Sequence, residues 1–497
     1  MITNSILSKE NDAEAQAYYR AVVAKDTRFD GIFFTGVKTT GIYCRPVCSA
    51  KTPRASSCVF FTSAAAAEAN GYRPCLRCRP ELAPYALQQN LAFAVWQKIT
   101  AGALNDGDLE QLSAQVGLSS RQLRRVLLQE FGVSPVELAQ TQRLLFAKKL
   151  LQETSLPMAE LAYAAGFGSV RRFNALFEQR YKMTPGSIRR STSGDDSKDL
   201  VLRLAYRPPY AWDALLAYLG GRAMPGLEAV LELAYVRSVR MDDKTGWIKV
   251  THLPERGQLA LQVAPSLSSV LMPLLAKVRT QFDMEANPSV IQAHLASDSL
   301  LAQQMARTPG LRVPGAFDVF ELAIRAVLGQ QVSVAGATTV SGRLVRAFGE
   351  PLTTPFAEVT HHFPSIALLA QLPVEDIATI GVPKSRAATI QNLARFALAG
   401  GLQQKIGASA DAVVADLKTV VGIGEWTAQY IALRALRFPD AFPAGDLGLQ
   451  KAAAIAPESR VTEKQLLQRA SAWSPWRSYA ALLLWQSLSY TSKTSKE

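Results

Sequence analysis

The sequence predicts a multidomain, mainly α-helical protein that also contains two small mixed domains. Three observations predict this fold class. All five cysteines fall between positions 44 and 78, among short β-like runs such as GIFFTGV and CVFFTS. A helical segment then repeats, with 108–135 echoed by 158–185. After it, alternating segments such as VLRLAY and LALQV give way to Ala- and Leu-rich stretches.

These changes of pattern divide the 497 residues into five segments. We expect a small α+β metal-binding domain with a short helix near 63–70, and an all-α helix-turn-helix domain. A polar linker, STSGDDSKD, would follow, then a small α/β domain with a helix over AWDALLAYLGGR and a second all-α domain. The boundaries, in that order, are 1–85, 86–190, 191–199, 200–287 and 288–497.

Charge favours a nucleic-acid partner. The chain has 54 basic and 41 acidic residues, and 24 and 15 of these fall within residues 1–190. Such an excess suits a polyanion, with an anionic membrane surface as the second choice. The sequence MITNSILSKENDAEAQ does not resemble a signal peptide, and no apolar run of about 18 residues is present. We expect a cytosolic protein with no membrane span.

The cysteines have metal-ligand spacing. Three residues separate Cys44 from Cys48, and two separate Cys75 from Cys78. Four thiolates favour zinc, and an iron–sulfur cluster is the alternative. A purely structural zinc site is the simplest interpretation of such spacing. Cys58 lies in the apolar run CVFF, where we expect it to be buried and uninvolved.

The internal repeat predicts DNA-binding helices. Leu112 matches Leu161 and Gly117 matches Gly166, so each copy has a helix, a glycine turn and a second helix. An ordinary helical hairpin would be the default for one copy. Residues 88–190 resemble the arabinose-regulator class of transcription factors. That resemblance makes these residues groove-facing candidates, although some arginines would contact only phosphate: Ser120, Arg121, Gln122, Arg124, Ser169, Arg171, Arg172 and Asn174.

The motifs TTGIYCRPVC and GYRPCLRCRP, followed by the repeat, resemble the N-terminal half of the bacterial Ada adaptive-response proteins over roughly 10–190. The resemblance implies one zinc ion held by Cys44, Cys48, Cys75 and Cys78. It also implies that Cys44 irreversibly accepts a methyl group from a DNA methylphosphotriester. Flanking residues would then hold the DNA backbone, unless they are merely solvated: Thr40, Arg45, Lys51, Arg73 and Arg77.

The implied reaction has a simple electrostatic logic. Zinc keeps thiols ionised, and a zinc ion with four thiolates carries a net charge of about −2, which repels ordinary phosphate but not a neutral phosphotriester. Methylation leaves about −1 and favours DNA binding, so we expect damage to switch on transcription of alkylation-response genes, with RNA polymerase as a partner. Full-length Ada-type proteins usually add a second, cysteine-dependent methyltransferase domain. No cysteine follows Cys78, so the second half must do something else.

The segment LKTVVGIGEWTAQYIALRALRFPDAFPAGDLGLQ predicts a helix-hairpin-helix. Gly422 and Gly424 would let a phosphate approach the main chain, although a GxG turn alone is a weak signal. Together with RAVLGQQVSVAGA and WSPWRSYAALLLW, this segment resembles 3-methyladenine DNA glycosylase II over roughly 200–490.

The second resemblance implies hydrolytic release of alkylated purines from DNA. Asp446 takes the position of the catalytic carboxylate, and Trp426, Tyr430 and Trp485 take positions that line the base pocket. Aromatic rings favour a cationic, electron-poor base by stacking and cation–π attraction. Ordinary core packing would otherwise explain these rings.

Two positions depart from the family pattern. Gln331 stands where the best-known members insert a leucine wedge into DNA, and Val421 replaces a proline before the hairpin glycines. Lyase-competent relatives have a lysine at the position of Trp426, so we expect a monofunctional glycosylase that forms no Schiff base. With no cysteine available, we expect no iron–sulfur cluster there either.

We therefore predict a bifunctional alkylation-response protein that combines a methyl sensor and activator with an alkylpurine glycosylase. We expect it to act as a monomer on double-stranded DNA in the bacterial cytoplasm, associated with the nucleoid. The competing hypothesis is a transcription regulator whose second half is a non-catalytic DNA- or ligand-binding domain.

Overall fold

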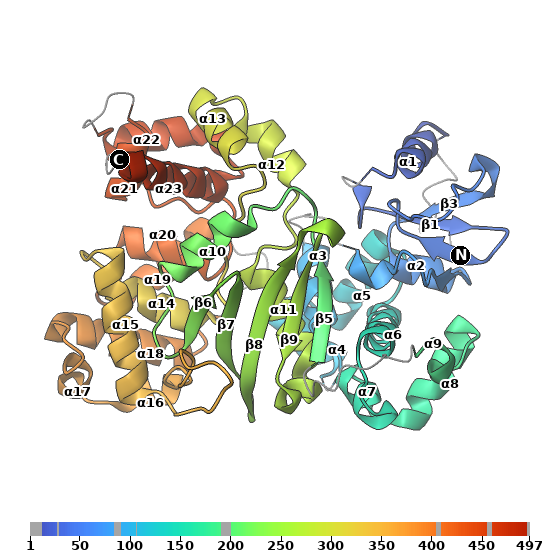
Figure 1. The fold of residues 1–497 in the computed structure, drawn as a ribbon, viewed down its shortest axis with the longest axis horizontal. Helices are drawn as coiled ribbons and strands as arrows, with labels where there is room; N and C mark the ends of the chain where they lie inside the picture. Colours follow the sequence, from blue (N-terminus) through green and yellow to red (C-terminus); the bar gives the residue numbers. More distant parts are fainter. Residues whose placement is uncertain are drawn as a thin grey trace.

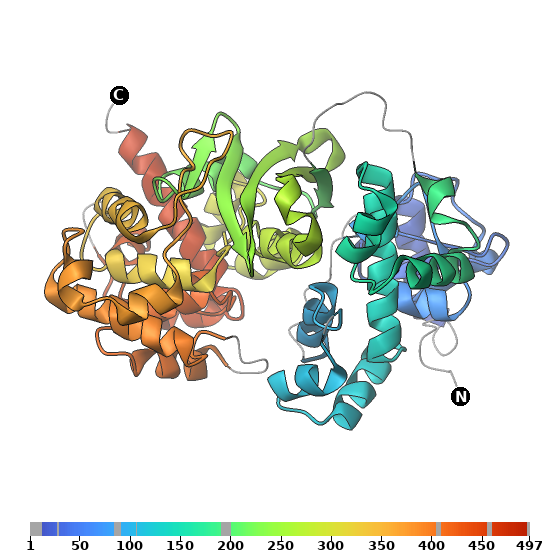
Figure 2. The ribbon, with the colours of Figure 1, turned by 90° about the horizontal axis from the view of Figure 1, so that it is seen from below.

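The computed structural model describes residues 12–26, 29–83, 91–105, 107–189, 200–403, 409–454 and 460–494. A five-stranded sheet lies in the middle, with the C-terminal helices on one side and the cysteine-bearing and helix-turn-helix parts on the other (Figures 1 and 2). The predicted multidomain, mainly helical fold class is confirmed. The predicted linker, 191–199, lies outside the described residues.

The cysteine-bearing part is a four-stranded sheet with the strand order β3-β1-β2-β4. Strand β1 pairs antiparallel with β2 and β3, and β2 pairs parallel with β4. The expected short helix is present as α2, because the Ser63 hydroxyl caps it by accepting from the Ala66 N–H. The elements are α1 (Asp12–Ala24), β1 (Phe34–Val37), β2 (Ile42–Cys44), β3 (Cys58–Phe61), α2 (Ala64–Ala69) and β4 (Arg73–Pro74).

Two helix-turn-helix units follow, joined by the long helix α6. Their turn glycines, Gly117 and Gly166, have φ of +68° and +79°, which favours glycine. The matched Leu112 and Leu161 are both buried, as the repeat predicts. The helices are α3 (Leu91–Thr100), α4 (Leu109–Gln115), α5 (Ser120–Phe131), α6 (Pro135–Glu153), α7 (Met158–Ala164), α8 (Val170–Tyr181) and α9 (Pro185–Ile188).

The next part is an antiparallel sheet with the order β5-β9-β8-β7-β6. Burial alternates along β9, as its apolar–polar alternation predicts. The elements are β5 (Leu200–Ala205), α10 (Trp212–Gly220), β6 (Glu228–Leu231), β7 (Ala234–Met241), β8 (Lys244–Leu253), β9 (Gln258–Val263) and α11 (Leu271–Gln281).

The C-terminal part is helical, and its core is built largely from Leu, Ile, Val and Ala side chains. The helices are α12 (Pro288–Leu295), α13 (Ser299–Arg307), α14 (Val319–Leu328), α15 (Val334–Phe348), α16 (Ile366–Gln371), α17 (Val374–Ala378), α18 (Lys384–Leu398), α19 (Ala410–Lys418), α20 (Glu425–Arg434), α21 (Leu447–Ala452), α22 (Glu463–Ala470) and α23 (Arg477–Thr494). None of the helices within the described ranges has the length and apolar character needed to cross a membrane.

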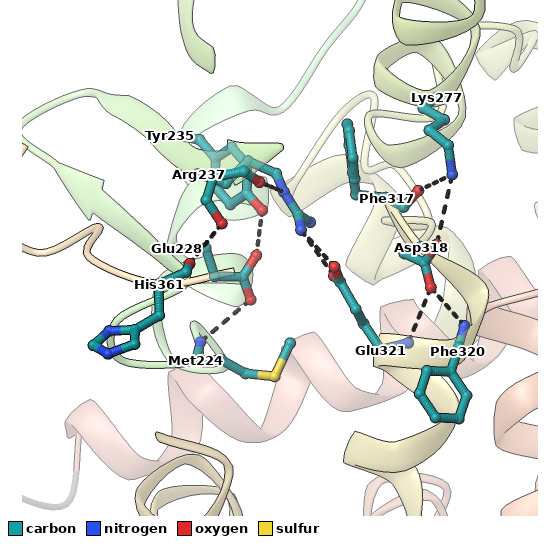
Figure 3. A network of polar contacts seen from close by, with 11 residues as sticks. Met224, Glu228, Tyr235, Arg237, Lys277, Phe317, Asp318, Phe320, Glu321 and His361 are labelled. Carbon is teal, nitrogen blue, oxygen red and sulfur yellow. Dashed lines mark hydrogen bonds and ion pairs between the residues drawn. The ribbon is translucent and has the colours of Figure 1, made fainter. Parts of the chain in front are cut away.

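A polar network fixes the sheet to α14 (Figure 3). Arg237 of β7 donates to both carboxylate oxygens of Glu321 at 2.9 and 2.8 Å, while Glu228 of β6 accepts from the Tyr235 hydroxyl. Asp318 caps α14 by accepting from the main-chain N–H groups of Phe320 and Glu321. Burial raises the pKa of Glu321 to about 7, although Arg237 opposes this shift. The network orients α14, whose C-terminal end leads directly into the Gln330–Gln331 loop.

The two halves of the chain meet along the free edge of β5. Lys149 of α6 donates to the Arg203 carbonyl, and Glu153 accepts from the Arg203 N–H at 3.0 Å. Two side chains of α6 therefore satisfy edge groups that a neighbouring strand would otherwise satisfy. Glu153 also pairs with Arg79 at 2.7 Å. This ion pair joins the cysteine-bearing domain to the contact between α6 and β5.

Candidate functional site

The four metal-ligating cysteines meet where two parallel strands end. Tyr43 of β2 pairs with Pro74, the last residue of β4, so the residues that follow them, Cys44 and Cys75, lie side by side. Short turns bring back Cys48 and Cys78, and all four sulfurs lie within 4.8 Å of one another. Zn–S bonds of about 2.3 Å in a tetrahedron place sulfurs about 3.8 Å apart. The cluster therefore fits one zinc ion, as the sequence predicts.

The sulfurs strongly perturb one another's ionisation. Hydrogen bonds with Cys48 and Cys75 raise the pKa of Cys44, whereas hydrogen bonds from Cys44, Cys48 and Cys78 lower that of Cys75. Four thiols this close cannot all ionise unless a cation neutralises them. Four sulfur donors are a suitable ligand set for a metal ion, and the positive charge of the ion would offset the repulsion between the thiolates. Cys58 lies apart from the cluster in β3 and is buried, as expected.

Arg45 does not fit the DNA-backbone role predicted for it. Its side chain is only 11% exposed and pairs with the carboxylate of Asp30. It also donates to the Cys78 carbonyl at 3.2 Å, and its main-chain N–H donates to the Cys78 sulfur at 3.4 Å. We correct its role to a structural one: Arg45 holds the loop of Cys78, which sequence alone does not reveal because Asp30 is distant from both.

The other flanking candidates lie near solvent. Thr40, Lys51 and Arg77 are exposed, and Arg73 is half-buried in β4. Thr40 lies in the turn after β1, where its hydroxyl approaches the Val37 carbonyl at 3.4 Å. Their side chains are therefore accessible for the predicted contacts with the DNA backbone.

Glu68, which the sequence reasoning missed, links the metal domain to the DNA-binding helices. This buried carboxylate accepts from the Tyr43 hydroxyl at 3.1 Å, from Thr141 of α6 at 3.1 Å and from Tyr181 of α8 at 3.2 Å. Burial raises the pKa of Glu68 to about 7, against the effect of these hydroxyls. Tyr43 directly precedes Cys44, so a continuous set of contacts runs from the metal site to a helix-turn-helix unit.

The predicted groove-facing residues divide into two groups. Arg121, Arg124, Arg171, Arg172 and Asn174 are exposed on α5 and α8. The remaining three have local roles: Gln122 completes a capping box with Ser119, Ser169 caps α8, and the Ser120 hydroxyl donates to Glu110 at 3.2 Å.

Glycine occupies the two hairpin positions, 422 and 424, for different structural reasons. Gly422 has φ of +95°, and a Cβ there would lie 1.9 Å from the Thr389 hydroxyl, so only glycine fits. Gly424 caps α20 with φ of −92°, and a Cβ there would meet nothing within 4 Å. Gly424 therefore leaves the N-terminus of α20 open to a phosphate.

Asp446 is held by two indoles. Trp426 donates to its Oδ2 at 2.9 Å, and Trp485 donates to its Oδ1 at 3.0 Å. Oδ1 also accepts from the Leu449 N–H at 2.9 Å, since Asp446 caps α21. The carboxylate is half-buried, and its orientation is fixed by three donors from separate parts of the chain.

The predicted pocket residues form one aromatic group around this carboxylate. The Trp426 and Tyr430 rings stack with centroids 5.3 Å apart at 15°, and the Trp485 ring meets Tyr430 edge-on at 6.1 Å. A site that combines a fixed carboxylate with aromatic faces can bind an electron-poor base and stabilise positive charge beside it.

Gln331 projects from the loop that faces the hairpin. It is exposed and has φ of +55°, an uncommon backbone conformation for a non-glycine residue. The preceding Gln330, which sequence reasoning missed, donates to the Gly422 carbonyl and to the Thr427 hydroxyl, both at 3.0 Å. Arg386 donates to the Gln330 carbonyl at 2.7 Å. The loop is thus anchored by Gln330 and presents Gln331 outwards.

Four family models match the chain, in the order that the motifs predict. The metal binding domain of Ada matches 17–81, and a helix-turn-helix domain matches 112–191. The AlkA N-terminal domain matches 201–318, and the HhH-GPD superfamily of base excision DNA repair proteins matches 324–476.

Relatives match both the whole chain and its second half. A probable bifunctional transcriptional activator/DNA repair enzyme AlkA of Mycobacterium tuberculosis is 38% identical over 484 residues, 95% of this chain and 96% of that protein. DNA-3-methyladenine glycosylase 2 of Escherichia coli is 34% identical over 284 residues, 57% of this chain and 95% of that protein. The structure of a 3-methyladenine DNA-glycosylase from Archaeoglobus fulgidus aligns at 18% identity with a TM-score of 0.50, over 57% of this chain and 96% of that one, which shows a shared fold.

Proposed function

The chain belongs to the family of bifunctional transcriptional activators and DNA repair enzymes, and from this premise we propose that its halves carry out two different reactions on alkylated DNA. The N-terminal half takes a methyl group from a methylphosphotriester onto Cys44 and then activates alkylation-response genes. The C-terminal half hydrolyses the N-glycosidic bond of alkylated purines of the 3-methyladenine type.

Methyl transfer uses the electron pair of the Cys44 sulfur. A bound zinc ion would keep the thiols ionised at neutral pH. The Cys44 sulfur attacks the methyl carbon, a sulfur–carbon bond forms, and the carbon–oxygen bond breaks with its electron pair left on the phosphate. The other sulfurs are the largest influence on the pKa of each cysteine in the cluster. The choice of Cys44 as the nucleophile rests on its place in the motif that resembles the Ada proteins, whose metal binding domain matches 17–81.

The methylated sensor binds DNA more tightly because one negative charge has been removed from the cluster. Lys51, Arg73 and Arg77 then hold the backbone, while the exposed arginines of α5 and α8 enter or flank the major groove. The Glu68 contacts support this coupling, since they join the residue before Cys44 to α6 and α8. Activation further requires RNA polymerase as a partner, and we propose a monomer because one chain supplies both sets of residues.

The glycosylase proposal is carried by one observation, the Asp446 carboxylate held between the Trp426 and Trp485 indoles. An alkylated purine flips out of the duplex, stacks on the aromatic rings and leaves as positive charge develops on the sugar. Asp446 stabilises that charge and orients the attacking water. Trp426 has no amine to form a Schiff base, so the reaction ends with an abasic site and no strand cleavage.

The test uses the intact chain with DNA that contains both kinds of damage. Mass spectrometry should find one added methyl group on the peptide that contains Cys44, at most once per molecule. Chromatography should find alkylated purines released over many turnovers. A methyl group on another residue would refute the role of Cys44, and an Asp446→Asn protein that releases purines at the parental rate would refute the catalytic carboxylate.

A further inference from the structure

One turn of α20 beyond Tyr430 lies a buried guanidinium that faces two tyrosines. Arg434 is only 3% exposed. It donates to the Tyr218 hydroxyl at 2.7 Å, to the Tyr430 hydroxyl at 3.1 Å and to the Pro314 carbonyl. Tyr218 comes from α10 of the sheet domain, so this contact joins the C-terminal end of α20 to that domain.

Two further arginines add positive charge here. Arg222 lies 3.7 Å from the centroid of the Tyr218 ring, and buried Arg325 donates to the Thr338 hydroxyl at 3.1 Å. None of the ion pairs found in the described part of the chain includes Arg222, Arg325 or Arg434. Glu228 acts on Arg325 only at longer range. Buried cations normally have a counter-charge, and here the phenols are the groups that can supply it.

The two tyrosines differ in how readily they ionise. Burial opposes ionisation of Tyr430, but Arg434, Arg222 and Arg325 outweigh burial and lower the pKa of Tyr430 to about 8. Burial raises the pKa of Tyr218 in spite of Arg222 and Arg434. Tyr218 therefore stays protonated and can donate to an ionised Tyr430. The remaining rings against Tyr430, Trp426 of its own helix and Trp485 of α23, do not titrate.

We propose that Tyr430 supplies a negative charge to the base pocket, that Tyr218 and Arg434 hold this charge in place, and that it makes the pocket select cationic bases over neutral ones. The inference rests on the proposed glycosylase function and assigns Tyr430 a specificity role beyond stacking. Tyr218 and Arg434 act through Tyr430 as positioning residues.

An alkylated purine loses its positive charge during the reaction, so a negative charge on Tyr430 would attract the substrate base but not the released product. An N3- or N7-alkylated purine is a cation while it is attached to the sugar. When a cationic base enters, the Tyr430 hydroxyl loses its proton to solvent and the phenolate attracts the base. When the glycosidic bond breaks, its electron pair stays on the base, which becomes neutral. The attraction to Tyr430 is then lost, and the product is free to leave.

The first test observes the ionisation of Tyr430 directly. Ultraviolet difference titration of the intact protein should show one tyrosinate that forms near pH 8. This signal should disappear in Tyr430→Phe and persist in Tyr163→Phe, which removes an exposed tyrosine of α7. Persistence of the signal in Tyr430→Phe would overturn the proposal.

The second test compares two substrates across pH. At DNA concentrations well below saturation, where the rate reports ionisation of the free protein, release of 3-methyladenine, which is cationic in DNA, should rise by about tenfold between pH 7 and 9 as Tyr430 ionises. Release of the neutral base ethenoadenine should lack this rise. Tyr430→Phe should abolish the rise for 3-methyladenine, and Tyr218→Phe should move it to higher pH because the phenolate loses a donor.

The outcomes separate this inference from the proposed function. A wild-type protein that releases neither base refutes the glycosylase function itself. If wild type releases 3-methyladenine but Tyr430→Phe keeps the same pH profile, the glycosylase stands and the charge proposal falls. Equal losses for both bases in Tyr430→Phe and Tyr218→Phe, with unchanged pH profiles, would mean that the tyrosines only pack the helices.

Discussion

The two candidate sites are assembled in opposite ways. The metal site draws all four ligands from one stretch of chain between Cys44 and Cys78, and a single pair of parallel strands brings them together. The proposed glycosylase site draws Tyr218 from α10, Trp426 and Tyr430 from α20, Asp446 from the start of α21 and Trp485 from α23. A local site depends on its own small sheet and its metal, whereas a dispersed site depends on correct packing of two domains.

The two sites also differ in whether the reacting group is consumed. In our proposal a thiolate is consumed by a covalent bond, so the sensor reports damage once. A carboxylate that only stabilises charge is regenerated, so the glycosylase turns over. Substitutions at one site, at the other, or in the contacts between them should therefore have different effects.

The largest effect should follow Cys75→Ser. Structural zinc sites contribute roughly 10 kcal/mol to folding, and Cys75 is a buried ligand. We expect loss of zinc and of all methyl uptake, while purine release stays within about twofold because the second site has its own core. Metal analysis and base release measured on the same preparation check this. A parallel loss of purine release would show that the sites are not independent.

The next effect concerns the contact between the halves. Glu153→Gln removes the ion-pair partner of buried Lys149 and one of the two carboxylates that pair with Arg79, which should cost about 3–5 kcal/mol. We expect calorimetry to show a larger separation between the unfolding transitions of the two halves than in wild type. Glu375→Gln is the matched control, since that ion pair with Lys384 is exposed and its loss should leave the unfolding of the protein unchanged. An unchanged separation of the transitions in Glu153→Gln would contradict the role of this contact.

A third change distinguishes the two hairpin glycines. Gly422→Ala should destabilise the protein by about 2–4 kcal/mol, because of its positive φ and the contact with Thr389. Gly424→Ala should keep its stability, because a Cβ there meets nothing within 4 Å, and it should lose affinity for DNA if a phosphate binds at this helix start as we propose. Thermal unfolding and DNA titration measure the two effects. Equal stability losses at both positions would contradict this assignment.

The metal site is easier to predict from sequence than the glycosylase site, because its residues are close together in the chain. The cysteine cluster and the double helix-turn-helix could be predicted because their residues are close in sequence. Asp446 and its aromatic neighbours could be predicted only through a resemblance. Glu68, Gln330 and Arg434 were missed, because each contacts residues that are distant in sequence.

Arg45 is a residue whose role was wrongly predicted for the same reason, a contact with a residue distant in sequence. Its sequence position beside Cys44 predicted a contact with DNA, but tertiary packing places Asp30 against it. A basic residue next to a site is exposed or paired according to contacts that no local pattern encodes.

The smallest effect is a pH dependence at Glu68. Its pKa is raised to about 7 in the folded protein from an ordinary 4.5, so its contribution to stability is present below about pH 4.5 and is lost as the pH rises through 7. Glu68→Gln cannot ionise, and it should gain on wild type by about 2–3 kcal/mol between pH 4.5 and 7. Chemical denaturation at several pH values measures this difference. A difference that does not change with pH would contradict the ionisation of Glu68.

In our proposal one chain carries two separable repair chemistries, one at Cys44 and one at Asp446. The most direct measurement quantifies methyl uptake and purine release together, on DNA with both lesions, for wild type, Cys44→Ser and Asp446→Asn. We predict that Cys44→Ser loses only methyl uptake and that Asp446→Asn loses at least about 100-fold in purine release alone. Loss of both activities in either variant, or of neither, would contradict the account.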